Sequence, residues 1–398
     1  MRRKSMSDSL SSLHEHERTY EQERRGSEVT PFELFFDLVF VFGFIQVTTY
    51  LADNPTWTGV LRGTALLATL WWAWICYSWL TNSVPTDEGL RERVVLLCAT
   101  AAMFVAALAV PNAFGRAGVL FGVAYFVVRA LHVGLYAIAT ESTPGTRDGI
   151  FRLGPGLLTA STLLVITGFL DGALQATFWI AALAIDYGTP AVKGVSGFGV
   201  HAEHFVERYR DIVTIALGES ILAIGLEVRS DDPSSLATIA PIALLGIALA
   251  ATLAWLYFDQ VTIAMEQNLA RANDTERASM ARDTYSYLHL PIVAGIIFVA
   301  LGLKKTVAEA GTPLDAIPAV ALCGGAALYL LGDAACRLRD TGSVGTLRLA
   351  VAATVCGLVF FAIQVPAFVT LAVIVLLFAV LAALETAGLN PQWRVRAD

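Results

Sequence analysis

The chain has 398 residues, of which 56% are hydrophobic and only 15% are charged, and its formal net charge is -7. Soluble domains carry about 25% charged residues, so this composition is that of an integral membrane protein. The basic residues are spread along the chain, which excludes the basic patch of a nucleic-acid-binding protein. We therefore expect the lipid bilayer, and no nucleic acid, as a partner.

Residues 1–28 are polar and charged, and we interpret them as a disordered cytoplasmic tail. The His14 and His16 cluster in this tail is expected to be solvated rather than metal-bound. Twelve apolar blocks follow, and a membrane span needs about 20 apolar residues. They lie near 34–52, 59–80, 93–110, 118–139, 153–170, 173–187, 205–227, 236–258, 285–303, 316–336, 347–364 and 366–385.

The blocks lack the alternation of barrel strands, so they predict helices. The predicted fold class is all-α, a polytopic membrane helix bundle of about 12 transmembrane helices. Because the blocks at 153–170 and 173–187 are short, a count of ten or eleven stays open. A long loop at 260–284 is expected to form a surface helix or a helix pair.

An internal repeat divides the chain. The segment FELFFDLVFV aligns with VERYRDIVTI, which pairs Glu33 with Glu207 and Asp37 with Asp211. Two six-helix repeats of one orientation form a parallel repeat, an arrangement found in transporters. The predicted organisation is a tail at 1–28, a first repeat at 29–187, a Gly-rich cytoplasmic linker at 188–203, a second repeat at 204–386, and a cytoplasmic C-terminal tail at 387–398.

Lys and Arg residues set the expected orientation. With the N-terminus inside, they divide 21 to 5 in favour of the cytoplasmic segments, and Arg129 is left within a span. Cytoplasmic loops carry the excess of Lys and Arg. We therefore expect a multi-pass protein of the plasma membrane with both termini in the cytoplasm.

Ionisable residues at the start of the first block are the first candidate site. A charge in hydrocarbon costs at least ~2.5 kcal/mol, so it needs a partner, a wet cavity or a function. Thr30 is an expected N-cap, Pro31 suits the first helical position, and Glu33 lies where a capping box places its acid. Capping cannot explain Asp37, one turn deeper on the same face, so a structural ion pair and a site role are its two alternatives.

The seventh block carries a second candidate site. His204, Glu207 and Arg208 open it, and Glu219 follows eleven residues after Arg208, within about 20° on the same helical face. Glu219 lies roughly 18 Å along the axis from Glu207, which places it near mid-membrane. There it must be protonated, paired or ion-binding. The spacing of His201 and His204 suits a metal, but we interpret it as a polar helix start.

Other single groups extend the candidate list. Arg129 and His132 share a face of the fourth block, and Arg129 is the expected counter-ion of Asp37 or Glu219. His289 begins the ninth block. In the assigned topology most of these groups fall in the cytoplasmic half, which predicts a polar vestibule open to the cytoplasm with Glu219 at its deepest point.

Small residues and missing motifs complete the pattern. Gly218 and Gly225 are predicted to let another helix approach closely. The cysteines are expected to be packing residues, neither disulfides nor metal ligands: Cys76, Cys98, Cys323, Cys336 and Cys356. The sequence has no Walker A, GxSxG, HExxH or CxxC motif. We therefore expect no cofactor and no metal.

These motifs resemble the bacterial low temperature requirement A (LtrA) family. The resemblance is carried by TPFELFFDLVFV from Thr30, WWAW from Trp71, HFVER from His204, LGES from Leu217 and YLHLPI from Tyr287. It covers about residues 29–385. It implies a membrane protein, but the family name records a growth requirement in the cold and not a reaction.

The leading functional prediction is a secondary transporter or channel for an ion, a proton or a small solute, using intramembrane carboxylates. Two alternatives stay open: an intramembrane enzyme acting on a lipid or isoprenoid through acid and base groups, and a non-catalytic membrane component for cold or envelope adaptation. Whether the protein is an enzyme, and which residues would be catalytic, is left open. The predicted substrate- or ion-binding residues are Asp37, Glu219, Glu33, Arg129, Glu207, Arg208, His204, His289 and His132.

Overall fold

The computed structural model describes residues 29–84, 89–140, 143–227 and 233–387. Within these ranges the chain is helical apart from short connections and contains no strand, which confirms the all-α prediction. A single antiparallel bridge joins Pro313 and Pro366. The N-terminal tail with His14 and His16, and the C-terminal tail from residue 388, lie outside the described residues.

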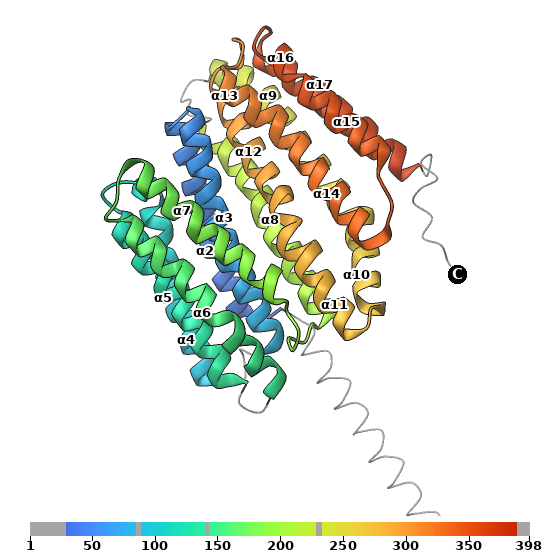
Figure 1. Ribbon diagram of the computed structural model, residues 1–398. Coiled ribbons are helices and arrows are strands. Elements are labelled where there is room, and N and C mark those ends of the chain that lie inside the picture. Colours follow the sequence, from blue (N-terminus) through green and yellow to red (C-terminus); the bar gives the residue numbers. More distant parts are fainter. Residues whose placement is uncertain (1–28, 85–88, 141–142, 228–232, 388–398) are drawn as a thin grey trace, which may run out of the picture.

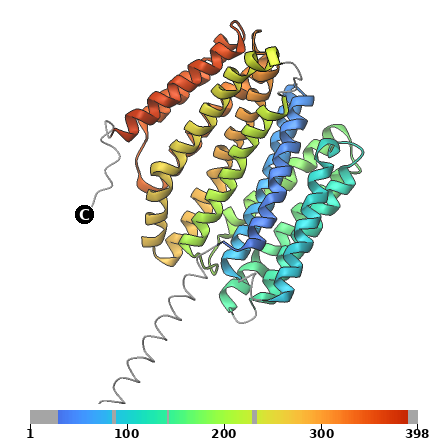
Figure 2. The same cartoon turned by 180° about the vertical axis from the view of Figure 1, so that it is seen from behind.

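The N-terminal group of helices is drawn from blue to green in Figure 1. Its members are α2 (Pro31–Asp53), α3 (Trp57–Ser83), α4 (Leu90–Ala109), η1 (Val110–Asn112), α5 (Gly118–Ala139), α6 (Pro144–Thr167) and α7 (Gly172–Lys193). All are α-helices except the 3-10 turn η1. The view from behind in Figure 2 shows the same group lying side by side with the later helices.

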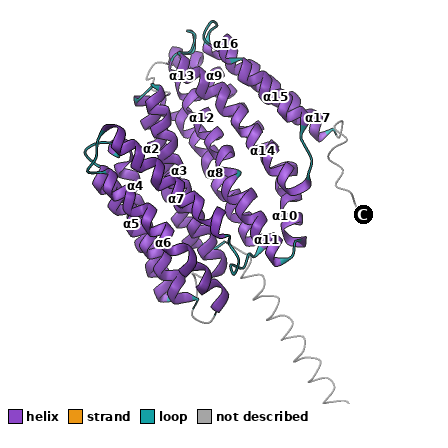
Figure 3. Cartoon of the chain, viewed as in Figure 1, coloured by secondary structure: helices purple, strands orange, loops and turns teal. Residues whose placement is uncertain are grey.

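The C-terminal group is drawn from yellow-green to red, and helices dominate it as they do the first (Figure 3). Its members are α8 (Ala202–Glu227), α9 (Pro233–Leu256), η2 (Tyr257–Val261), α10 (Thr262–Arg271), α11 (Asp274–Met280), η3 (Ala281–Tyr287), α12 (His289–Ala308), α13 (Ala316–Ala319), η4 (Val320–Gly324), α14 (Gly325–Thr341), α15 (Thr346–Gly357), α16 (Val359–Ala362) and α17 (Ala367–Thr386). The segments η2, η3 and η4 are π-helices that continue one α-helix into the next. The segment 260–284, predicted to be a loop with a surface helix or a helix pair, contains α10 and α11, which π-helices join to α9 and α12.

Local sequence explains how α2 begins and which face it buries. The hydroxyl of Thr30 accepts a hydrogen bond from the backbone N–H of Glu33 at 3.3 Å, and Pro31 takes the first helical position. Phe36, Phe40 and Phe44 are fully buried, while large side chains on the opposite face, such as those of Phe35 and Leu38, are exposed. In a bilayer, that outer apolar face lies against lipid.

The two groups meet along α2 and α3 on one side and α8 and α12 on the other. Among the described residues, nine helical stretches are long and apolar enough to cross a bilayer. They are Pro31–Asp53, Trp57–Ser83, Leu90–Asn112, Gly118–Ala139, Pro144–Thr167, Ile239–Arg271, Asp274–Ala308, Ala316–Thr341 and Ala367–Thr386. A multi-pass membrane bundle is therefore confirmed in outline, whereas twelve spans are not. The blocks predicted at 173–187, 205–227 and 347–364 form α7, the charge-bearing α8, and the short α15 and α16.

Two predicted details need correction. The helix predicted to end at 187 continues through Pro190 to Lys193, so the first residues of the expected linker are helical. The chain leaves the helix at Gly194, whose φ of 71° suits glycine. Nothing lies within 4 Å of a Cβ built on Gly218 or Gly225, so no described helix makes the close approach predicted there.

Candidate functional site

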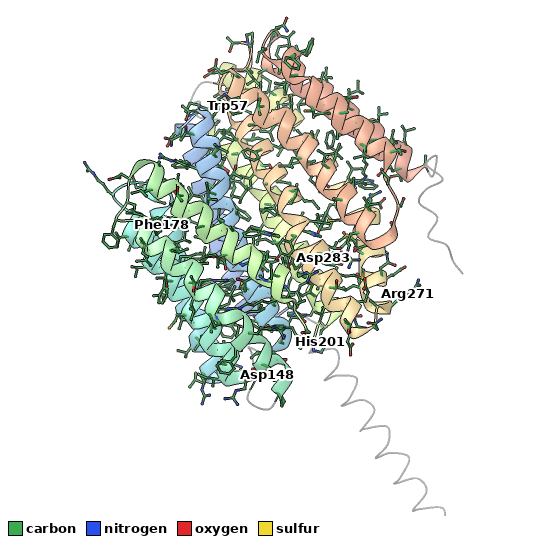
Figure 4. The ribbon with its side chains drawn as sticks, in the orientation of Figure 1. Trp57, Asp148, Phe178, His201, Arg271 and Asp283 are labelled. Carbon is green, nitrogen blue, oxygen red and sulfur yellow. The ribbon has the colours of Figure 1, made fainter. Side chains whose placement is uncertain are left out.

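Side chains from α2, α3 and α8 meet where α2 and α8 begin. We call Glu33, Asp37, Asn82, His204 and Arg208 the seam cluster, because they join the two groups of helices. All are buried, and Asp37 and Arg208 are 0% exposed. His201, labelled in Figure 4, marks this end of the bundle. The structure thus brings together four of the predicted site residues from two distant parts of the sequence.

Asp37 and Arg208 form a bidentate ion pair. Arg208 Nη1 lies 2.8 Å from Asp37 Oδ2, and Nη2 donates to Oδ1 at 2.9 Å. Trp74 Nε1 also donates to Oδ1 at 2.9 Å, and the guanidinium carbon lies 5.7 Å from the Trp74 ring centroid. Both oxygens of Asp37 therefore have strong donors, as a structural ion pair requires.

His204 bridges Asn82 and Glu33. The amide of Asn82 has a fixed orientation, because its Oδ1 accepts from the His201 backbone N–H at 2.9 Å and its Nδ2 donates to the His201 carbonyl at 3.0 Å. Its Nδ2 also lies 3.2 Å from His204 Nδ1, which must then be the acceptor. The imidazole is therefore neutral, with its proton on Nε2, and donates it to Glu33 Oε2 at 2.9 Å.

Glu33 makes contacts both within the start of α2 and with α8. Its Oε1 accepts a hydrogen bond from the Thr30 hydroxyl at 3.1 Å, within the helix start. Its Oε2 faces both His204 and, at 3.7 Å, Arg208 Nε. The carboxylate thus links the cap of α2 to α8.

Glu219 lies further along the same contact. It is 2% exposed, and the side chain of Thr48 on α2 lies beside its carboxyl group. The two side chains do not reach hydrogen-bonding geometry, so within the described part of the chain Glu219 Oε2 and Thr48 Oγ1 have no partner. Lys304 on α12, which pairs with Glu227 at 3.5 Å, also acts electrostatically on Glu219.

Glu219 lies beyond the middle of α8. Glu219 is eight residues before the end of α8 at Glu227 and seventeen after its start at Ala202. At 1.5 Å per residue, it lies about 12 Å from one end and about 25 Å from the other. Glu219 is therefore nearer to the end of α8 that lies opposite the seam cluster, and the vestibule expected to close at Glu219 stays a prediction.

The sequence predicted that Arg129 pairs with Asp37 or Glu219, but in the structure it pairs with neither. Its Nη2 lies 2.6 Å from Asp186 Oδ1 on α7, and its Nη1 contacts the thiol of Cys76. Tyr125 donates to the other oxygen of Asp186 at 3.0 Å. Arg129 therefore holds α5 to α7 inside the N-terminal group.

A second buried ion cluster, missed by the sequence reasoning, lies in the C-terminal group. Arg348 on α15 donates to Glu385 on α17 at 2.9 and 2.7 Å and also contacts Asp333 on α14. Arg337 lies 3.0 Å from the same Asp333 oxygen. The available signal was an arginine and a glutamate inside the last two apolar blocks.

The two remaining histidines lie apart from the seam cluster. His289 Nδ1 lies 2.9 Å from the carbonyl of Thr284, which can only accept, so this nitrogen carries the proton. Tyr257 then donates to Nε2 at 3.1 Å, and the histidine joins η2 to η3. His132 lines an apolar cavity of about 50 Å³ beside Trp72 and Trp79, and neither of its ring nitrogens has a partner among the described residues.

Glu207 is exposed and lines a surface cleft. The cleft measures about 480 Å³ and is bordered by four acids and one arginine: Glu203, Glu207, Asp211, Glu266 and Arg210. Glu207 Oε2 also accepts from the backbone N–H of Val29 at 3.2 Å. In the described ranges, no three His, Cys, Asp or Glu side chains are grouped to hold a metal ion.

Comparisons with known proteins agree with the predicted resemblance. The family model described as bacterial low temperature requirement A protein (LtrA) matches residues 28–383. A protein of Rhizobium meliloti (strain 1021), described as uncharacterized protein RA0937, is 33% identical over 316 residues, which cover 75% of each chain. No solved structure matches this chain. The buried seam cluster and the multi-pass helical bundle are thus features of a chain that belongs to the bacterial low temperature requirement A family.

Proposed function

We propose that this protein is a secondary transporter or channel for an ion or small solute, acting at the contact between its two groups of helices. The observation that carries the proposal is that ionisable groups cross this contact at two levels. Asp37 faces Arg208 at one level, and Glu219 lies beside Thr48 at the other. Buried ionisable groups are rare in membrane proteins and mark substrate and ion pathways.

We further propose twelve spans in two parallel six-helix repeats. The nine apolar stretches are joined by α7, α8 and the combined α15 and α16. The order of packing neighbours supports this, because the same pairs of helices are in contact in both halves. In the first half the contacts are α3–α7, α2–α4, α4–α5, α5–α6 and α6–α7. The corresponding contacts in the second half are α9–α17, α8–α12, α12–α14, α14–α15 and α15–α17. Transporters bind their substrates at such repeat interfaces.

Reciprocal contacts of two aligned glutamates also support the repeat. Glu33 on α2 contacts His204 near the start of α8, and Glu207 on α8 accepts from Val29 just before α2. Such exchanged contacts are expected of two equivalent helices around an axis that runs parallel to them. The distribution of Lys and Arg supports a plasma-membrane orientation in which the seam cluster faces the cytoplasm.

Flux through reconstituted liposomes tests the proposal. The full chain would be assayed for movement of protons, Na⁺, K⁺ and candidate solutes. The matched variants are Glu219→Gln, which keeps the size of the side chain, and Glu309→Gln, which changes an exposed glutamate. We expect flux in the wild type and in Glu309→Gln, and loss of flux in folded Glu219→Gln. Absence of every flux from folded wild-type protein contradicts the proposal.

One observation favours the enzyme alternative. His132 is 3% exposed and faces an apolar cavity, as a general base for an apolar substrate would. Lipid extracts from cells that lack the protein, complemented with wild type or His132→Phe, test this function. Identical lipid profiles in all three strains exclude it. A non-catalytic role predicts that carboxylate variants fail only by losing folded protein.

A further inference from the structure

We propose that the transported or coupling ion is a proton and that Glu219 carries it. This inference rests on the proposed transport function and names its ion. Glu219 is a buried carboxyl group at the contact of α2 with α8, and its Oε2 has no partner within the described ranges. A buried polar atom without a partner needs an explanation, and a bound proton supplies one.

The surroundings of Glu219 do not suit a metal cation. Hard cations such as Ca²⁺ and Mg²⁺ take about six to eight oxygen ligands, and K⁺ in a filter exchanges its water shell for rings of carbonyl oxygens. In the described residues, the polar side chains that act on the carboxyl group are the hydroxyl of Thr48 and the ammonium group of Lys304. A proton needs a single lone pair, so one carboxyl oxygen is a complete site for it.

Lys304 provides a second argument. Its ammonium group acts on Glu219 and lies 3.5 Å from Glu227, at the end of the bundle nearest to Glu219. A positive side chain repels a metal cation entering from that end. The same charge stabilises the carboxylate that forms when the proton leaves.

Both protonation states of Glu219 therefore have a favourable neighbour. The hydroxyl of Thr48 on α2 lies beside the carboxyl group, and a hydroxyl can accept a proton in a hydrogen bond as well as donate one. The carboxylate has the field of Lys304 on α12. Proton release breaks one O–H bond and passes the proton to water at the end where α8 and α12 finish, so no other reactant is required.

The location of Glu219 links its protonation to the contact between the two groups. Thr48 follows Asp37 by eleven residues on α2, and Glu219 follows Arg208 by eleven residues on α8. Loading or removing a proton changes the charge at a contact that already holds one ion pair. Protonation of Glu219 at the contact between α2 and α8 can therefore favour one relative position of the two groups of helices over another.

Proton flux and infrared spectroscopy on the full chain test the proposal together. Liposomes would enclose a pH-sensitive dye and be energised by a K⁺ gradient with valinomycin. We expect wild type and Glu309→Gln to move protons, and Glu219→Gln to lose the flux by about tenfold or more. Thr48→Val, which keeps the shape and removes the hydroxyl, should shift the pH at which flux is half maximal.

The infrared difference spectrum between acidic and alkaline buffer tests the wild type directly, and Glu219→Gln assigns the band. A carbonyl band of a protonated carboxyl group should appear in wild type, shift in D₂O and vanish in Glu219→Gln. Absence of such a band in wild type overturns the proposal. Flux of Na⁺, K⁺ or solute that depends on Glu219 without any proton movement overturns the proton assignment and leaves the transport function standing. Absence of every flux removes both.

Discussion

Arg208 donates hydrogen bonds from two nitrogens to the carboxylate of Asp37, and the two residues are 171 positions apart in the chain. The same offset of 171 separates Glu33 from His204, and Thr48 from Glu219. Because the offset stays constant, α2 and α8 run parallel and in register along the contact. A change in the register of either helix would disturb all three contacts at once.

The ion pair itself gives the first prediction. Removing one partner of a buried pair leaves an uncompensated charge and destabilises by about 3–5 kcal/mol. Arg208→Met should therefore lower the free energy of unfolding by this amount, measured by chemical unfolding of the purified protein in detergent. The double variant Asp37→Leu/Arg208→Met should recover most of the loss, because neither charge remains. Equal stability of Arg208→Met and wild type would contradict the pairing.

Asn82 gives a second prediction, which concerns the protonation of His204. In wild type the ¹⁵N NMR shifts of His204 should report a neutral ring with its proton on Nε2, since Asn82 donates to Nδ1. Asn82→Asp replaces that donor with an acceptor, so the ring should become doubly protonated between two carboxylates. Asn82→Leu is the control, because it removes the donor without adding a charge. A neutral ring in Asn82→Asp would show that Asn82 does not set its protonation.

The cluster in the C-terminal group gives a third prediction. Arg348 is 1% exposed and contacts Asp333 and Glu385 from two other helices. Arg348→Gln should cost about 3–5 kcal/mol in unfolding free energy. Arg339→Gln is the matched control, since Arg339 pairs with Glu276 and Asp283 at the partly exposed surface, and surface pairs contribute about 0–1 kcal/mol. Similar losses for the two variants would argue against the burial of the Arg348 cluster.

The proposed orientation gives a fourth prediction. Ser196 lies between α7 and α8, and Thr312 lies after α12, and both are exposed. With the N-terminus inside, an impermeant charged maleimide added to intact cells should label Thr312→Cys, and should label Ser196→Cys only after permeabilisation. Wild type measures the background from the native cysteines. The reverse pattern would invert the orientation, and labelling of both sites in intact cells would exclude an odd number of spans between them.

The sequence predicted individual helix starts and inward faces well, because these depend on neighbouring residues. The Thr30 cap and the inward position of Asp37 both follow from local spacing. Partner choice could not be predicted in the same way. Arg129 was expected to meet Asp37 or Glu219 but meets Asp186, because α5 packs against α6 and crosses α3 rather than lying against α2 or α8.

The candidate site shows the same division. Glu33, Asp37, His204 and Arg208 were identified from charges inside apolar blocks, yet nothing local revealed that Asn82 fixes the ring of His204. Asn82 is polar, buried and near the end of α3, a combination that appears only when the chain is folded.

The contacts across the π-helix η3 require that the number of residues in this segment stays the same. Across it, the Thr284 carbonyl faces His289 and the Ser286 hydroxyl donates to the Ala281 carbonyl, each five positions away. Deleting one residue from 281–287 would restore an ordinary turn and rotate one side of it by about 100° relative to the other. Ser286 would turn away from Trp71 and Trp79, or His289 from Tyr257. Single-residue insertions and deletions should therefore be rejected in η3.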